Sequence, residues 1–286
     1  LAFSPDGTRL ASASEDGTVV TWDVAGAKED KTIKAHEGTV YCVAYSPDGA
    51  KLATAGGDKL IKLWNVADGA ETGKLEGHGE AVWCVAFSKD GAKIVTSSAD
   101  RTVKVWEAAG KEMFTLAGHK DWVTSFALSP DGKSLITGSF DRTVRQWNLE
   151  AAPQTAAAVA AAITAEQTAR QAALAADAEA ATATKTVETA QTALKDAGED
   201  AAKKEAAQKA LTEAEAAAKA ATDKKAEADQ AAASAKAALD GAQSLLSTPL
   251  GTLKSTIWTV VLSPDGTTLA VGSHDESLRM WRLGAW

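Results

Sequence analysis

Short runs in which apolar and polar residues alternate make up most of the chain, and turn residues separate these runs. In one representative stretch, residues 40–45 are rich in β-formers and residues 46–49 read Ser-Pro-Asp-Gly, where Pro presets φ and Gly supplies a positive φ. Residues 51–55 and 60–64 continue as second and third strands, and a short fourth strand lies around 71–75. The pattern predicts a unit of four antiparallel strands.

This unit occurs five times, because five similar phrases each end in a tryptophan at a nearly constant spacing. The first three intervals are 42, 42 and 41 residues, and Asp-Gly turns keep the same spacing. The last interval is much longer, so an insertion of roughly 93 residues displaces the fifth unit. The five tryptophans are Trp22, Trp64, Trp106, Trp147 and Trp281.

The period and the tryptophan-terminated phrases resemble the WD-repeat (WD40) family, whose repeats build β-propeller blades of four antiparallel strands. The resemblance covers about two thirds of the chain, everything outside the insertion. It implies an all-β WD40 propeller with five recognisable repeats, fewer than the seven blades most common in this family. Because the chain opens inside a first strand, we expect a fragment that forms an incomplete ring with open strand edges.

The insertion is rich in alanine, the best helix former, and contains no aromatic residue. Gly198 divides it almost evenly, Pro153 suits a helix start and 240–241 (Asp-Gly) suit a stop. We therefore expect an antiparallel hairpin of two helices, about 153–196 and 199–240, inserted between the third and fourth strands of blade four.

The domain boundaries follow from this placement: blades one to four over 1–152, the hairpin over 153–247, and the end of blade four with blade five over 248–286. No clean heptad runs through the sparse large apolar residues of the hairpin. Three interpretations stay open for it: a mobile spacer, a segment that orders on a partner, and a dimerising coiled coil.

Three repeats share a His before the first strand, a Thr on the second strand, an Asp in the next turn and the Trp. The family resemblance implies a hydrogen-bond network within each blade. His, hydroxyl and Asp also form hydrolytic triads, but an enzyme needs one active nucleophile and this set is repeated three times. We expect no catalytic residue, cofactor or metal. The sets are His36/Thr54/Asp58/Trp64, His78/Thr96/Asp100/Trp106 and His119/Thr137/Asp141/Trp147.

The first and fifth repeats keep only part of this set. In the fifth repeat Val271 replaces the hydroxyl and Thr252 stands where Gly-His is expected, so this blade should be the least stable. The residues retained are Ser12, Asp16 and Trp22 in the first repeat, and Asp275 and Trp281 in the fifth.

Two cysteines, Cys42 and Cys84, occupy equivalent first-strand positions in neighbouring repeats. Two are too few for a disulfide framework or for a structural zinc site by themselves. We expect both to act as small buried hydrophobic residues.

The resemblance also implies that partners bind the face that carries the starts of the first strands and the turns between second and third strands. Tyr41, Trp83, Trp122 and Phe140 should cluster there, and Arg101 and Arg142 flank them. Aromatic residues flanked by Arg are typical of interface hot spots. The alternative is that some rings pack between blades. Trp258 and Trp286 are two further tryptophans that the repeated set does not explain.

The net charge of −8 disfavours nucleic acid and anionic membranes as partners. No leader sequence is visible, which slightly favours the cytoplasm, although we expect the true N-terminus to be missing. The function predicted is a non-catalytic scaffold for protein–protein interaction. The alternatives are an accessory module of a larger enzyme, and a self-assembly module that associates through the hairpin or the open blade edges.

Overall fold

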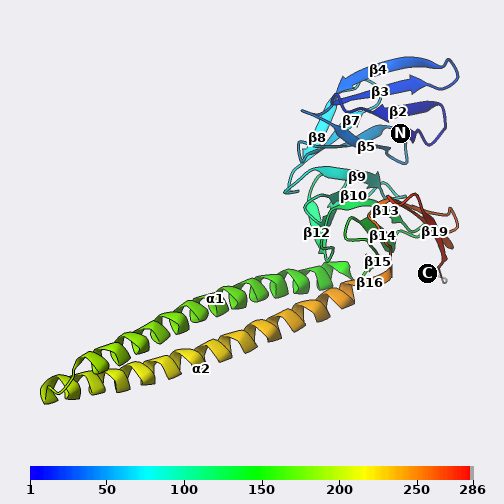
Figure 1. The fold of residues 1–286 in the computed structure, drawn as a ribbon. Helices are drawn as coiled ribbons and strands as arrows, with labels where there is room; N and C mark the ends of the chain where they lie inside the picture. Colours follow the sequence, from blue (N-terminus) through cyan, green and yellow to red (C-terminus); the bar gives the residue numbers. More distant parts are fainter. Residues whose placement is uncertain (284–286) are drawn as a thin grey trace. The chain divides into compact units, whose positions relative to one another are not determined.

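Antiparallel sheets follow one another along the chain in the computed structural model (Figure 1). The structure describes residues 1–283, and it describes only the backbone of residues 154–156, 160 and 243–246. The first sheet contains β1 (Ala2–Phe3), β2 (Arg9–Ala13), β3 (Thr18–Asp23) and β4 (Lys28–Lys34) in sequence order. The second contains β5 (Val40–Tyr45), β6 (Lys51–Gly56), β7 (Ile61–Asn65) and β8 (Glu71–Leu75). Each sheet is a meander in which consecutive strands pair.

The remaining sheets follow the same plan, except that the last has three strands among the described residues. The third contains β9 (Val82–Phe87), β10 (Lys93–Ser98), β11 (Thr102–Glu107) and β12 (Glu112–Ala117). The fourth contains β13 (Val123–Leu128), β14 (Ser134–Ser139), β15 (Thr143–Asn148) and β16 (Ser247–Thr252). The fifth contains β17 (Ile257–Leu262), β18 (Thr268–Ser273) and β19 (Leu278–Arg282).

The Asp-Gly turns between first and second strands are fixed by local hydrogen bonds. In the second sheet the Ser46 hydroxyl donates to Asp48, and Asp48 accepts the backbone N–H of Ala50 at 3.0 Å. Gly49 has a φ of 71°, a left-handed conformation that favours glycine. The turn sequence predicted this reversal for the same physical reason.

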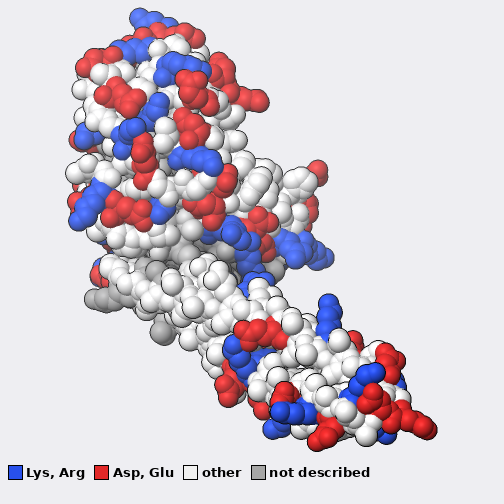
Figure 2. All heavy atoms as spheres, turned by 90° about the vertical axis from the view of Figure 1, so that its left-hand side faces the viewer, with Lys and Arg blue, Asp and Glu red and all other residues white. Residues whose placement is uncertain are grey.

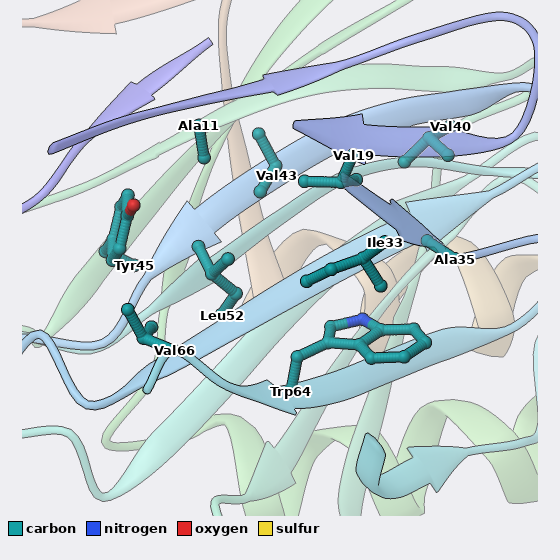
Figure 3. Close-up of a cluster of buried hydrophobic side chains, with 10 residues drawn as sticks. All are labelled: Ala11, Val19, Ile33, Ala35, Val40, Val43, Tyr45, Leu52, Trp64 and Val66. Atoms are coloured by element: carbon teal, nitrogen blue, oxygen red, sulfur yellow. The ribbon is translucent and has the colours of Figure 1, made fainter. Parts of the chain in front are cut away.

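The sheets pack face to face through shared apolar cores, and the first strand of each sheet lies against the first strand of the next. Figure 3 shows the core between the first two sheets, where Val19 and Ile33 meet Leu52 and Trp64. Hydrogen bonds supplement this packing between the fourth and fifth sheets, since the Thr124 hydroxyl donates to the carbonyl of Ile257 at 2.7 Å. Each sheet therefore completes its neighbour's core.

The insertion forms two long helices, α1 (Ala152–Asp196) and α2 (Ala201–Leu246), which run side by side in opposite directions (Figure 1). It joins β15 to β16, where Trp147 pairs with Ser247, so the chain leaves and re-enters the fourth sheet at one place. α2 begins two residues later than expected, because the Asp200 carboxylate accepts the N–H of Lys203 and caps the helix.

The predicted stop at 240–241 is wrong, because α2 continues through Gly241 to Leu246. A glycine inside a helix costs about 1 kcal/mol relative to alanine, which a long alanine-rich helix tolerates. β16 begins directly after this helix, at Ser247.

The less exposed positions of both helices follow a strict 3–4 spacing, the spacing of a coiled-coil seam. In α1 these positions run from Val159 and Ala162 to Leu194, and in α2 from Ala207 and Leu211 onward. We expected no clean heptad from the large apolar residues, and the spacing is indeed carried mostly by alanine. Ion pairs join the helices across the seam, as Lys224 bonds to Glu179 at 2.6 Å.

The chain divides into two compact units, the sheets and the hairpin segment Ala158–Ala242. None of the helices in the described part of the chain is long and apolar enough to span a membrane.

Candidate functional site

Each of the three complete His/Thr/Asp/Trp sets is brought together by the fold in the same geometry. In the first set, His36 Nδ1 lies 2.8 Å from Asp58 Oδ1 and His36 Nε2 lies 2.7 Å from Thr54 Oγ1. Trp64 Nε1 donates to the same Thr54 hydroxyl oxygen at 3.0 Å. The second set has corresponding distances of 2.7, 2.7 and 2.9 Å, and the third has 2.9, 2.7 and 2.8 Å.

The donors in each set point in one direction. An indole N–H can only donate, so the Thr oxygen accepts from Trp and its O–H is free to donate to His Nε2. The imidazole then donates from Nδ1 to the Asp. Burial lowers the pKa of the His36 and His119 rings, which favours the neutral imidazole that this chain of donors requires.

The carboxylates of Asp100 and Asp141 are held ionised at the end of this chain. Burial raises the pKa of the Asp141 carboxyl, but hydrogen bonds from His119, Thr143 and the backbone N–H of Lys120 outweigh burial. The pKa of Asp141 therefore lies well below its ordinary value, and the pKa of Asp100 is lowered in the same way.

The distances match those of a hydrolytic triad, but the accessibility does not. Thr54, Thr96 and Thr137 are all fully buried, at 0% exposure. Each hydroxyl already bonds to a Trp and a His. A nucleophile must reach its substrate, and these three hydroxyls are closed off from solvent.

Six rings form a second constellation, which we call the aromatic surface. They come from the starts of first strands and from the turns between second and third strands. The contacts between ring centroids are Tyr41–Trp83 at 4.4 Å, Trp83–Trp122 at 5.8 Å, Trp83–Trp258 at 6.2 Å, Trp122–Phe140 at 5.2 Å, Phe140–Trp258 at 4.9 Å and Trp258–His274 at 6.4 Å.

The aromatic surface is open to solvent rather than enclosed between sheets. Tyr41, Trp122 and Trp258 are 39%, 41% and 44% exposed. Trp83 contacts three of the other rings and is half-buried, and its buried indole N–H has no hydrogen-bond partner in the described structure. Exposed rings of this size that touch one another form a continuous apolar patch.

Two arginines follow the turn aspartates on the same kind of turn. Arg101 and Arg142 are exposed and have φ values of 73° and 69°, in the left-handed region. Lys59, at the equivalent position, donates to the carbonyl of Gly79 at 2.6 Å. The two guanidinium groups form no hydrogen bond or ion pair with the described residues, so they are free to bind an external acceptor. Figure 2 shows acidic and basic side chains interspersed on the face it draws.

The comparison with known families bears on both constellations. The model of the WD domain, G-beta repeat, matches residues 1–23, 27–65, 69–107, 110–148 and 247–282. The chain belongs to the WD40 family. No curated protein matches it.

Each matched WD40 segment after the first spans two sheets. The segment 27–65 contains β4, the last strand of the first sheet, together with β5, β6 and β7 of the second. His36 lies between β4 and β5, and its backbone N–H donates to Gly17 O of the first sheet. The His36 set therefore ties the second sheet to the preceding one.

The incomplete WD40 repeats replace this network in two ways. In the first repeat, Trp22 Nε1 still donates to Ser12 at 2.9 Å, and Asp16 bonds to Thr18. In the fifth repeat Asp275 bonds to Ser277 in its own turn, and Trp281 packs against the apolar core.

The position assigned to Thr252 is corrected by the structure. Thr252, the last residue of β16, pairs with Thr143 on β15. The backbone N–H of Leu253 donates to the carbonyl oxygen of Arg142 in the turn. Leu253 is buried beside Ile257 and Val271, so apolar packing stands where other repeats carry the network. The insertion separates β16 from β15, so no continuous spacing from the preceding Trp could reveal this shift in the sequence.

Sequence reasoning also left Trp258 and His274 out of the partner-binding set. Trp258 follows Ile257 as Trp83 follows Val82, and that equivalence was the available signal. The contact between Trp83 and Trp258 joins the third and fifth sheets, which no repeat spacing indicates. Trp286 lies outside the described residues.

Proposed function

We propose that the chain is a non-catalytic platform for protein–protein interaction and that a protein partner binds the aromatic surface. WD40 repeats generally mediate scaffolding between proteins. The observation that carries the proposal is the continuous patch of six rings, three of them about two-fifths exposed.

The chemistry of this patch suits a protein interface. Trp and Tyr are enriched among hot-spot residues because they bury a large area with few rotatable bonds. Arg101 and Arg142 add planar donors that can bind a carboxylate or backbone carbonyl of the partner. The rings supply apolar contact area, and the arginines supply directional hydrogen bonds.

The backbone at these arginines supports the same proposal. Non-glycine residues in the left-handed region are strained by about 1 kcal/mol relative to glycine. The first repeat has Gly17 at the equivalent position, with a φ of 86°. The guanidinium groups of Arg101 and Arg142 form no intramolecular hydrogen bond within the described residues, which favours an intermolecular role for them.

A photo-crosslinking experiment tests the proposal. A benzophenone amino acid at position 122 should crosslink a protein partner, and the Trp258→Ala background should abolish the product. Phe3→Ala is the matched control, because Phe3 is an exposed ring (64%) outside the aromatic surface. Equal capture of the partner by chains that carry the crosslinker at position 122 with and without Trp258→Ala, at unchanged stability, would contradict the proposal.

A further inference from the structure

The thiols of Cys42 and Cys84 lie side by side. Cys42 is on β5 and Cys84 on β9, and their Sγ atoms are 3.8 Å apart. Both residues are half-buried, which corrects the expectation of two separate buried hydrophobic residues. Equivalent positions in neighbouring repeats become direct neighbours because first strands of successive sheets pack against each other.

The neighbouring residues show that this approach of the strands is local and close. Tyr41 and Trp83, one residue before each cysteine, have ring centroids 4.4 Å apart. Cys42 Sγ also lies 3.6 Å from the carbonyl oxygen of Val85 on β9. Two consecutive positions of β5 therefore face the same stretch of β9.

We propose that Cys42 and Cys84 are a redox modification site, at which a peroxide or a low-molecular-weight disulfide forms a reversible disulfide between the second and third sheets. A disulfide requires an S–S distance near 2.05 Å, so the sulfur atoms must approach by side-chain rotation. The chain has two cysteines in total, so no other thiol of the same chain competes.

The reaction balances with hydrogen peroxide as the oxidant. The Cys42 thiolate attacks one peroxide oxygen, the O–O bond breaks, and hydroxide leaves, giving a sulfenic acid on Cys42. The Cys84 thiol then attacks this sulfur and the S–O bond breaks, so that water leaves and the S–S bond forms. Two thiols and one peroxide give one disulfide and two waters.

The electrostatics assign the roles within the pair. The hydrogen bond with Cys84 lowers the pKa of the Cys42 thiol below its ordinary value, which raises its thiolate fraction. The same contact, together with burial, raises the pKa of Cys84 well above its ordinary value. Cys42 is thus the attacking sulfur and Cys84 the resolving one.

The test uses the full chain, reduced and then treated with stoichiometric hydrogen peroxide. The intact mass should fall by two hydrogens, peptide mapping should find Cys42 joined to Cys84, and dithiothreitol should reverse the change. The oxidised chain should melt about 5 °C or more above the reduced chain, because the crosslink restricts the unfolded state.

Variants separate the two steps. Cys84→Ser should accumulate a sulfenic acid on Cys42 that a dimedone probe traps. Cys42→Ser should react with peroxide at least about tenfold more slowly than the wild-type chain. Two free thiols after treatment, disulfides formed only between chains, or an unchanged melting temperature of the crosslinked chain would each overturn the proposal. The wild-type measurements stand even if a variant folds poorly.

Discussion

Single polar residues matter in this protein because each is one link in a buried chain of donors. Asp100 accepts from His78 Nδ1 at 2.7 Å, from the Gly79 N–H at 3.0 Å and from Thr102. Removing it leaves several donors without a partner at once. Its counterpart in the fifth repeat, Asp275, bonds to Ser277 in its own exposed turn.

Asp100→Ala should therefore lower the free energy of unfolding by about 1–3 kcal/mol, the cost of unpaired buried donors. Asp275→Ala is the matched control and should cost less than about 1 kcal/mol, since its partners lie in an exposed turn. Chemical denaturation of both variants measures the difference. Equal losses would show that the turn, and not the network, sets the stability.

The titration of the His rings gives a second expectation. The folded pKa of His119 lies below its unfolded value of about 6.5, so the unfolded chain binds more protons below that pH. Stability should be full above about pH 6.5 and fall as pH falls toward the folded pKa. Asp141, whose folded pKa is lowered, adds a further loss as pH falls below about 4.

Ring nitrogen NMR can check this expectation directly. The His36 and His119 rings should stay neutral, with the proton on Nδ1, at a pH where exposed imidazoles are already charged. Charging at the ordinary pKa, or a proton on Nε2, would contradict the donor direction inferred from Trp64 and Trp147.

Substituting the two arginines that have left-handed backbone should change stability and partner binding in opposite directions. Arg101→Gly with Arg142→Gly should raise the free energy of unfolding by about 0.5–1 kcal/mol per site, because glycine adopts this φ without strain. The same double variant should capture less partner. A combined measurement of thermal unfolding and crosslinking yield distinguishes this outcome from a variant that loses binding by unfolding.

At the scale of single elements, β19 differs from the other third strands: β3, β7, β11 and β15 each pair on both sides, whereas β19 pairs with β18 alone among the described strands. Leu278 and Met280 are 68% and 65% exposed on it. An open apolar edge is a site for pairing with another chain. Leu278→Lys with Met280→Lys should shift sedimentation toward the monomer at high concentration.

The control for this experiment is Leu174→Lys, which removes an equally exposed leucine (64%) from helix α1. If it reduces association as much as the edge substitutions do, then general surface hydrophobicity drives association. An effect confined to β19 would support association through the strand edge.

Much of this element-level structure could be predicted from the sequence. The Asp-Gly turns and Trp spacing predicted the strands, and Gly198, with a φ of 54°, marks the turn of the hairpin. The hairpin seam could not be identified from large residues, because alanine carries it. The shift at Leu253 was hidden for a different reason, since the insertion separates β16 from β15 and removes the spacing that aligns the other repeats.

At the scale of the whole molecule, the two compact units should be separable. Replacing 158–242 with a short Gly-Ser linker should leave the melting temperature of the sheets within about 3 °C of wild type. The linker would join the short helical segments that lead out of β15 and into β16, and these two strands are paired. The hairpin contains no aromatic residue, so tryptophan fluorescence reports the sheets alone. Loss of the cooperative unfolding transition in tryptophan fluorescence would show that the sheets depend on the hairpin.

The meeting of Trp147 and Ser247 has a consequence for how the fourth sheet folds. β16 is synthesised long after β15, yet the two strands are neighbours. If these residues formed a flexible loop, closing that loop would cost conformational entropy before the strands could pair. Two helices of nearly equal length that form locally and fold back on each other return the chain to its starting point first. The hairpin thus turns a long-range strand pairing into a short-range one, and its rate of formation should set when the fourth sheet closes.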